Sequence, residues 1–382
     1  MPSSTSNSEH ENSAVRYREI PTQPWVNATF VAALIVVAAI IAWEALARSM
    51  HHIPGTYQSG FKEMWAEERK KLDAPNDIRI VITGSSRILW ATDLDIMQQQ
   101  FGTRPIQLAL PGTSPAIFVE DVVNNTDFDG LVLVGITPFL VNWIGPGYFG
   151  GPALDFYKEP SPSDISGFYL HDFLSEYLAF LDEAFSLPEL KDHYIQLPQR
   201  EGAKVLNQQG WKLGDVFADR QTDMWPPVEQ VGSFDNQQVI NFWTRGIDLD
   251  KPVPEEKRQE MNQGLIDFFR PLVEKQRQKG GDIVFIRMPS SGDYLRKELL
   301  NDYTEKFWKP VMSELNAPYL DSFDHPELST DLEIPEWSHL SRQSQDDWSE
   351  RVPAHIERVY QTVREKPLKT IIGPDRKKDD TL

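Results

Sequence analysis

The sequence feature that most restricts the fold is one long apolar run near the N-terminus. From Ile20 to Trp43 no residue carries a formal charge, and the centre reads FVAALIVVAAIIAW. About 20 apolar residues in a helix cross the hydrocarbon core of a bilayer, and Trp25 and Trp43 stand near the two ends, where indoles favour the interface. A cleaved signal peptide has a shorter apolar stretch. Residues 20–47 are therefore predicted to form a retained transmembrane anchor.

The segments that flank this anchor are polar and differ little in charge. Residues 1–19 are rich in Ser and Asn and predict a disordered tail. Arg16 and Arg18 precede the span and Arg48 follows it, so the positive-inside rule does not decide the orientation. We expect the short tail inside the cell and the large domain outside, an expectation that comes from the function considered below. Residues 48–75 predict a charged, partly helical neck.

Composition excludes several classes of function. The chain has no cysteine, so disulfides, thiolate metal sites and cysteine nucleophiles are ruled out. A formal net charge of −19 argues against nucleic acid as a partner, because phosphate binding needs a positive field. His51 and His52 have no further ligands nearby in the sequence and predict a solvated pair rather than a metal site. No metal and no cofactor are expected.

After the neck, apolar runs alternate with amphipathic segments. The runs are short and β-branched, which suits strands covered on both faces, as in a parallel sheet. The alternation predicts a doubly wound, three-layer α/β/α domain over residues 76–365. Strands are predicted at 77–83, 105–110, 130–136, 282–289 and 317–323. Helices are predicted at 88–102, 115–126 and 255–281, with a last one through Trp348 and Val363 that Pro353 interrupts or restarts.

Two segments do not follow this alternation. Residues 138–254 are rich in Pro, Gly and aromatic residues and are too long for an ordinary loop. We interpret them as an aromatic-rich insertion with some helices, which either forms a lid or binding surface or only packs on the sheet. Residues 366–382 are predicted to form a flexible C-terminal tail.

The turn after the first predicted strand, TGSSR at 83–87, contains two serines. In open α/β sheets ligands bind beyond the carboxyl ends of the strands, which is where this turn lies. One interpretation is structural, because serine is a favoured helix N-cap. The other is a nucleophile, which needs an imidazole base held by a carboxylate. The loop PEWSHLS at 335–341 offers both groups, Glu336 and His339, three residues apart.

A serine turn after the first strand and an acid-x-x-His loop after the last resemble the SGNH (GDSL-like) hydrolase and acyltransferase superfamily. The resemblance maps the nucleophile onto Ser86, the base onto His339 and the orienting acid onto Glu336, which replaces the usual Asp. LALPGTSP is similar to the second block of the family, whose glycine donates to the oxyanion hole and corresponds to Gly112. In the third block, VGITPF, Thr137 stands where the family has Asn, so the hole would consist of backbone amides of Ser86 and Gly112 with weak help from Thr137.

With an anchor added, the layout resembles SGNH proteins that work with membrane-bound O-acyltransferases, as in alginate-type O-acetylation and teichoic-acid D-alanylation. The resemblance implies a single-pass inner-membrane protein whose large domain is extracytoplasmic. It would add or remove an O-acyl group, acetyl above all, on a cell-envelope polysaccharide through an acyl-serine. The alternative is a non-catalytic SGNH-like protein that binds a polysaccharide or assembles with a membrane-bound O-acyltransferase.

Five further residues are candidates for substrate contacts. Arg87 follows the nucleophile candidate and Arg287 ends a predicted strand, so either could bind an anionic group. The competing interpretation of both arginines is a structural ion pair. Aromatic side chains of the insertion could stack on sugar rings, and the candidates are Trp143, Tyr148 and Trp225.

Overall fold

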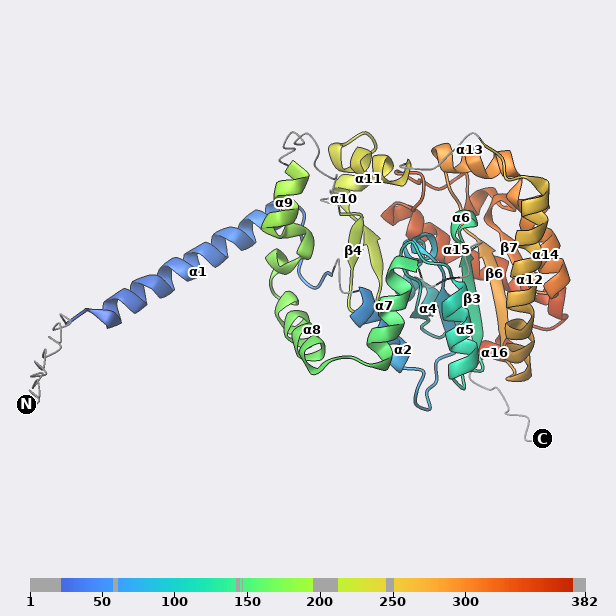
Figure 1. Ribbon diagram of the computed structural model, residues 1–382, viewed down its shortest axis with the longest axis horizontal. Coiled ribbons are helices and arrows are strands. Elements are labelled where there is room, and N and C mark those ends of the chain that lie inside the picture. Colours follow the sequence, from blue (N-terminus) through green and yellow to red (C-terminus); the bar gives the residue numbers. More distant parts are fainter. Residues whose placement is uncertain are drawn as a thin grey trace, which may run out of the picture. The chain divides into compact units, whose positions relative to one another are not determined.

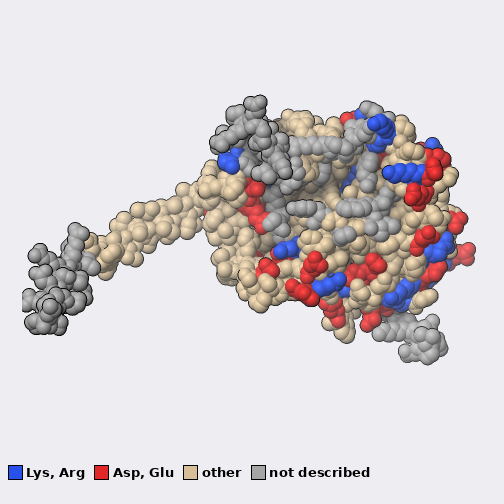
Figure 2. Space-filling view, viewed as in Figure 1, with Lys and Arg blue, Asp and Glu red and all other residues tan. Residues whose placement is uncertain are grey.

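The computed structural model describes residues 22–57, 61–141, 145, 147–194, 212–244 and 251–373. It divides into two units, Met1–Ala45 and Leu46–Leu382. The first unit contains most of helix α1 (Trp25–Ser49). Its apolar side chains are exposed along the helix, and most of its length carries no charged side chain (Figure 2). α1 is therefore long and apolar enough to cross a membrane.

The second unit is built on a five-stranded parallel sheet in the order β2-β1-β3-β6-β7 (Figure 1). Every paired neighbour is parallel, with registers such as Val81↔Ile106 and Leu131↔Asp282. The predicted α/β class and parallel sheet are confirmed. The strands are β1 (Ile80–Thr83), β2 (Ile106–Gln107), β3 (Leu131–Ile136), β6 (Asp282–Arg287) and β7 (Tyr319–Asp321).

Helices cover both faces of this sheet, as a three-layer α/β/α fold requires (Figure 1). The chain moves from β1 to β2 in one direction along the sheet and from β2 to β3 and onward in the other, so right-handed crossovers place the connecting helices on opposite faces. One face carries α5 (Ala116–Asn125), α12 (Glu255–Gln278) and α14 (Lys309–Leu315). The other carries α4 (Leu94–Phe101) and α15 (Arg342–Arg364).

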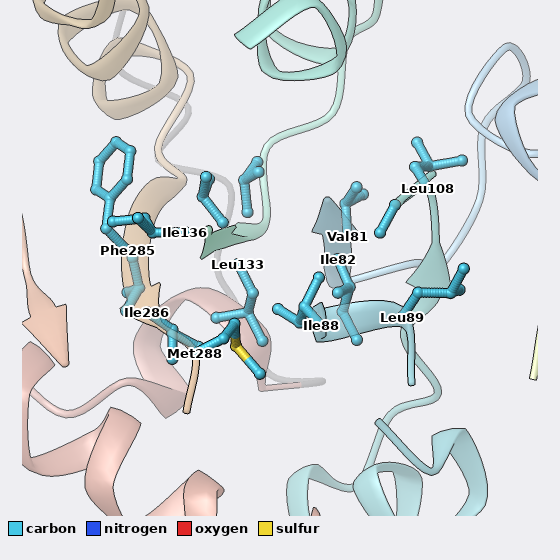
Figure 3. Packing of buried hydrophobic residues seen from close by; sticks show 14 of the residues in the cluster. Val81, Ile82, Ile88, Leu89, Leu108, Leu133, Ile136, Phe285, Ile286 and Met288 are labelled. Atoms are coloured by element: carbon cyan, nitrogen blue, oxygen red, sulfur yellow. The ribbon is translucent and has the colours of Figure 1, made fainter. Parts of the chain in front are cut away.

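The core between these layers continues to the carboxyl ends of the central strands (Figure 3). Ile88 packs there between β1 and β3. A Cβ on Gly84 would lie 2.6 Å from Ile88 Cγ2, and one on Gly135 would lie 2.5 Å from Ile88 Cβ. Gly84 also has φ +151°, which disfavours any other residue. The two glycines therefore let the serine turn lie directly against the end of β3.

Two helix predictions need correction. The predicted helix 88–102 is two helices, α3 (Ser86–Leu89) and α4, because Asp93 breaks the run and caps α4 by accepting a hydrogen bond from Ile96 N at 2.7 Å. The predicted break at Pro353 is absent, and α15 runs through it. The fully buried face of α15, which includes Trp348, Val352, Ile356 and Tyr360, packs on the sheet and offsets the hydrogen bond that proline cannot donate.

The neck and the tail are more ordered than predicted. Within the neck, α2 (Phe61–Lys70) packs against α7 (Gly147–Lys158), and Trp65 is fully buried with its Nε1 donating to Leu108 O at 2.9 Å. Beyond α15, α16 (Lys369–Ile372) buries Leu368, Ile371 and Ile372. Apolar side chains in both segments thus attach them to the domain. Residues 374–382 of the predicted tail lie outside the described part.

The insertion contains a two-stranded antiparallel sheet that the sequence does not predict, β4 (Gly214–Val216) with β5 (Thr222–Met224). Arg220, in the turn between them, is fully buried and donates from Nε to Gln107 O at 2.9 Å and from Nη1 to Phe61 O at 3.2 Å. Burial lowers the pKa of Arg220 to about 10. The hairpin is therefore fixed to the parallel sheet through backbone carbonyls.

The described part of the insertion also contains helices, as predicted, in addition to α7. In the insertion they are α6 (Pro138–Val141), α8 (Pro162–Ser175), α9 (Leu187–Tyr194), α10 (Pro226–Glu229) and α11 (Phe234–Thr244). Between β6 and β7, α13 (Gly292–Asn301) and a turn of π-helix (Thr304–Trp308) precede α14. Acidic and basic side chains are interspersed over the face of the domain shown in Figure 2.

Candidate functional site

The serine turn lies at the point where the strand order of the sheet reverses. β1 is followed by β2 on one side, and the chain then returns to place β3 on its other side. In doubly wound sheets the crevice beyond the carboxyl ends at this switch point is where ligands bind. Ser85 follows β1 and Thr137 follows β3, and their hydroxyl oxygens are 2.5 Å apart. This hydrogen bond fixes the two loops at the switch point.

The geometry of the turn bears on the helix-cap interpretation. Ser85 occupies the N-cap position of α3, but its hydroxyl makes no capping bond to that helix and bonds to Thr137 instead. Ser86 is the first residue of α3 and is 6% exposed. Because α3 is a single turn, its dipole contributes little. A helix-capping hydrogen bond from the Ser85 side chain therefore does not explain the serine turn.

Glu336 and His339 form a buried pair in the loop before α15. Oε1 of Glu336 lies 2.8 Å from Nδ1 of His339 and also accepts the backbone N–H of His339 at 2.5 Å. Both side chains are fully buried. A carboxylate can only accept, so Nδ1 carries the ring proton and Nε2 is the nitrogen that can take another. This is the arrangement that orients a general base.

The loop that carries this pair is held from several sides. Trp337 has φ +77°, and its ring fills the space over Gly292, where a Cβ would lie 2.4 Å from the indole. Ser291 N donates to Trp337 O at 3.0 Å. From the insertion, Asn236 donates through Nδ2 to Pro335 O at 3.0 Å. The insertion thus helps to position the loop and is more than an external elaboration.

Two contacts bring the serine helix and the histidine loop together. Arg87 Nε, next to Ser86, donates to Ser338 Oγ, next to His339, at 3.2 Å. The ring of Trp90, the C-cap residue directly after α3, lies 5.4 Å from the His339 ring between centroids at an interplanar angle of 60°. Sequence reasoning did not select Ser338 or Trp90, although each stands beside or within a candidate motif.

The two arginines proposed as substrate ligands are instead parts of a buried ion network, which favours the competing interpretation. Arg87 Nη1 lies 2.7 Å from Glu298 Oε1, and Arg287 Nη2 lies 3.0 Å from Glu298 Oε2. Arg287 Nη1 also lies 3.2 Å from Asp321 Oδ2. Both arginines are at most 3% exposed. Their charges therefore serve carboxylates of the protein rather than an outside anion.

The remaining predicted site residues are Gly112 and three aromatic residues of the insertion. Gly112 lies in an exposed turn with φ +58°, and a Cβ on Gly147 would be 3.5 Å from Gly112 O, so the start of α7 adjoins this turn. Tyr148 is the next residue of α7. Trp225 is only 3% exposed and its Nε1 donates to His51 O at 3.2 Å, so its ring faces offer no surface for a sugar. Trp143 lies outside the described residues.

The prediction of a solvated pair is wrong for His52. His52 is 3% exposed, and its Nδ1 lies 2.8 Å from Asp182 Oδ2. Asp182 also pairs with Lys212, which lies 2.6 Å from Asp215. Burial by itself raises the pKa of Asp182, but the hydrogen bond from His52 and the charge of Lys212 bring it below its ordinary value. The partners lie more than a hundred residues along the chain, which local sequence cannot indicate.

Comparison with protein-family models, with curated proteins and with solved structures gives no significant match. The class of this chain is therefore described from the arrangement of its sheet and the geometry of the two loops. They define an α/β protein with a five-stranded parallel sheet and one long apolar N-terminal helix.

Proposed function

We propose that the chain is a membrane-anchored, SGNH-like serine acyltransferase or esterase. The observation that carries this proposal is the buried Glu336–His339 pair, which contacts the helix that begins at Ser86. A serine, an imidazole and a carboxylate are the three groups needed for acyl transfer through a covalent intermediate. Their loops follow strands β1 and β7 of one parallel sheet, at the edge where such sheets bind ligands.

In the proposed reaction Ser86 Oγ attacks the carbonyl carbon of an acyl donor. The hydroxyl proton passes to Nε2 of His339, and Glu336 stabilises the resulting imidazolium through Nδ1–H. The donor carbon–oxygen bond then breaks, and the leaving oxygen takes the proton from His339. A hydroxyl of an acceptor, or water, repeats the sequence in reverse and frees Ser86.

The negative oxygen that forms on the carbonyl needs hydrogen-bond donors. The backbone N–H groups of Ser86 and Gly112 are the proposed donors, and Thr137 is the third. When Ser85 donates to Thr137, the Thr137 hydroxyl proton remains for another acceptor. The 2.5 Å contact between these hydroxyls is compatible with this direction. Thr137 would then replace the Asn of the family pattern.

The anchor and the resemblance together favour a cell-envelope polysaccharide as the acceptor, with an extracytoplasmic domain. α1 supports a membrane location through its length and exposed apolar surface. The start of α7 adjoins the Gly112 turn, so this part of the insertion is the proposed contact for a sugar.

The alternative, a non-catalytic binding or assembly protein, rests on the same Thr137. Its hydroxyl is engaged by Ser85, and an oxyanion hole with one weak donor fits a protein that has lost turnover. One experiment separates the two proposals, because only an activated serine reacts with a fluorophosphonate.

In the experiment, the full chain in detergent is exposed to a fluorophosphonate, and its intact mass is then measured by mass spectrometry. We expect a single adduct in the wild type and in Ser85→Ala, and none in Ser86→Ala or His339→Ala. Circular dichroism of each variant checks that it is folded. An adduct that persists in Ser86→Ala, or no adduct in folded wild type, would overturn the catalytic proposal.

A further inference from the structure

Three side chains with metal-ligating chemistry meet between the segment after β7 and helix α15. His325 is the residue between two 3₁₀ turns, Ser322–Asp324 and Pro326–Leu328. Glu327 belongs to the second of these turns, and His355 belongs to α15. One ligand atom from each lies within 4.8 Å of the others. The two imidazole centroids are 4.2 Å apart. The sequence did not predict this group, because His355 stands far along the chain from the His-Pro-Glu turn.

One spacing within the group matches coordination geometry. Around a tetrahedral Zn²⁺ with ligands at 2.0–2.1 Å, neighbouring ligand atoms are about 3.3 Å apart. His355 Nε2 lies 3.2 Å from Glu327 Oε1. The turn itself is fixed, since Leu328 N donates to His325 O at 2.9 Å and Ser329 Oγ donates to the same carbonyl at 3.1 Å. His325 and Glu327 are therefore held together before any ion binds.

His355 is the buried member of the group. It is 7% exposed, and its Nδ1 has no hydrogen-bond partner within the part of the chain that the structure describes. Burying a polar nitrogen without a partner is unfavourable. Nε2, the nitrogen that faces Glu327, is the ligand atom of the group, and Nδ1, which no described residue uses, can carry the ring proton when Nε2 binds an ion.

The surroundings favour a borderline metal over a hard one. Arg351 donates to Glu327 O at 3.1 Å but is paired with Asp347 at 2.9 Å, and Arg358 acts on His355 electrostatically. This positive charge opposes every divalent cation alike, so the donor atoms decide between metals: Ca²⁺ and Mg²⁺ need several oxygen ligands, and this group offers one carboxylate. Two imidazoles and one carboxylate suit Zn²⁺, with a water in the fourth position.

We propose that His325, Glu327 and His355 form a zinc site. Its ligands flank the segment that carries Glu336 and His339, with two before the loop and one in the helix after it. A bound ion would close this stretch of chain onto α15 and fix the loop. The proposal does not rest on acyl transfer, because the metal would act on the fold of the segment.

The test uses the full chain without a histidine tag, treated with a chelator and dialysed against Zn²⁺ in detergent. Elemental analysis should give about one equivalent of zinc, retained against an excess of Ca²⁺ and Mg²⁺, and the unfolding temperature should rise with zinc. Glu327→Gln and His325→Ala, whose side chains are partly exposed, should remain folded and lower the affinity by at least about tenfold. His51→Ala is the matched control, because His51 is exposed and elsewhere.

Zinc bound equally well by Glu327→Gln and His325→Ala would place the ion outside this group and overturn the proposal. So would the absence of stoichiometric zinc in a folded wild-type protein. A loss of affinity in His51→Ala equal to that in Glu327→Gln would count against it as well. His355→Gln, checked for folding, should lose the zinc-dependent rise in unfolding temperature.

Discussion

The guanidinium of Arg87 donates a hydrogen bond to the hydroxyl of Ser338 at 3.2 Å. The residue after the proposed nucleophile thereby contacts the residue before the proposed base, across 251 positions of sequence. Both residues are at most 9% exposed, so the bond is shielded from water. The serine helix and the histidine loop are therefore mutually positioned, and a change in either is expected to affect the other.

Substitution of Thr137 tests whether its hydroxyl belongs to the oxyanion hole. Thr137→Val removes the hydroxyl and should slow acylation of Ser86 by an activated ester by about 100-fold, since losing one donor commonly costs that much. Thr137→Ser keeps a hydroxyl and is the matched control, with a much smaller effect expected. Stopped-flow acylation rates give the comparison. Equal rates in the two variants would remove Thr137 from the oxyanion hole.

Glu336→Gln should disable the base without unfolding the loop. The amide cannot hold His339 in the required tautomer, and the equivalent change in a serine protease lowers turnover by about 10⁴-fold. Glu333→Gln is the control, because Glu333 lies three residues earlier and is exposed. The fluorophosphonate labelling rate is the measurement. A labelling rate in Glu336→Gln close to that of Glu333→Gln would exclude Glu336 from the mechanism.

Glu298→Gln should destabilise the fold strongly. It leaves the guanidinium groups of Arg87 and Arg287 buried beside a neutral amide, and breaking a buried pair in this way costs about 3–5 kcal/mol. Glu305→Gln breaks an exposed pair with Lys309 and should cost about 0.5 kcal/mol or less. Denaturant titration of tryptophan fluorescence compares them. Similar midpoints would mean that the network is not a structural requirement.

Asp182 should give the protein acid-dependent stability. Its folded pKa lies below the ordinary value of about 3.9, so its contribution is complete above that value and is lost as the pH falls through the lower folded one. In unfolding measurements from about pH 6 downward, the stability advantage of wild type over Asp182→Asn should shrink in acid. An advantage that stays constant with pH would contradict this.

The pKa of Asp215 is shifted in the direction opposite to that of Asp182. Burial raises the pKa of Asp215 above its ordinary value despite the nearby Lys212. Its protonation therefore stabilises the folded state as the pH falls through the raised value. As the pH falls from that raised value to the ordinary one, wild type should gain stability relative to Asp215→Asn, and this range lies above the one in which it loses stability relative to Asp182→Asn.

The sheet was predictable because its strands are short, continuous apolar runs bounded by turns. β3, with the sequence LVLVGI, is buried at every position and matches its predicted bounds almost fully. The hairpin β4–β5 was not predictable, because its strands GDV and TDM show no alternation of apolar and polar residues. It is held in place by Arg220, which donates to the carbonyl of Gln107, a residue distant in sequence. The division between α3 and α4 depends on one capping Asp within a pattern that otherwise has helical spacing.

In the candidate site, too, local contacts could be predicted from the sequence and contacts between distant residues could not. The Glu336–His339 contact is local, three residues apart, and could be anticipated from the motif. The partners of Arg87 and Arg287 could not, because Glu298 has no sequence signal that distinguishes it from other acidic residues. Burial, not residue type, decides that these arginines are structural. His52 shows the same effect, since only the fold brings Asp182 to it.

The pairing of β3 with β6 has a consequence for biosynthesis. Leu131 pairs with Asp282, so one edge of β3 stays unpaired until the whole insertion and α12 have left the ribosome. Sheets with such long-range pairing fold slowly, and open strand edges promote aggregation. The order of synthesis therefore leaves the centre of the sheet open along one edge until more than two thirds of the chain has been made.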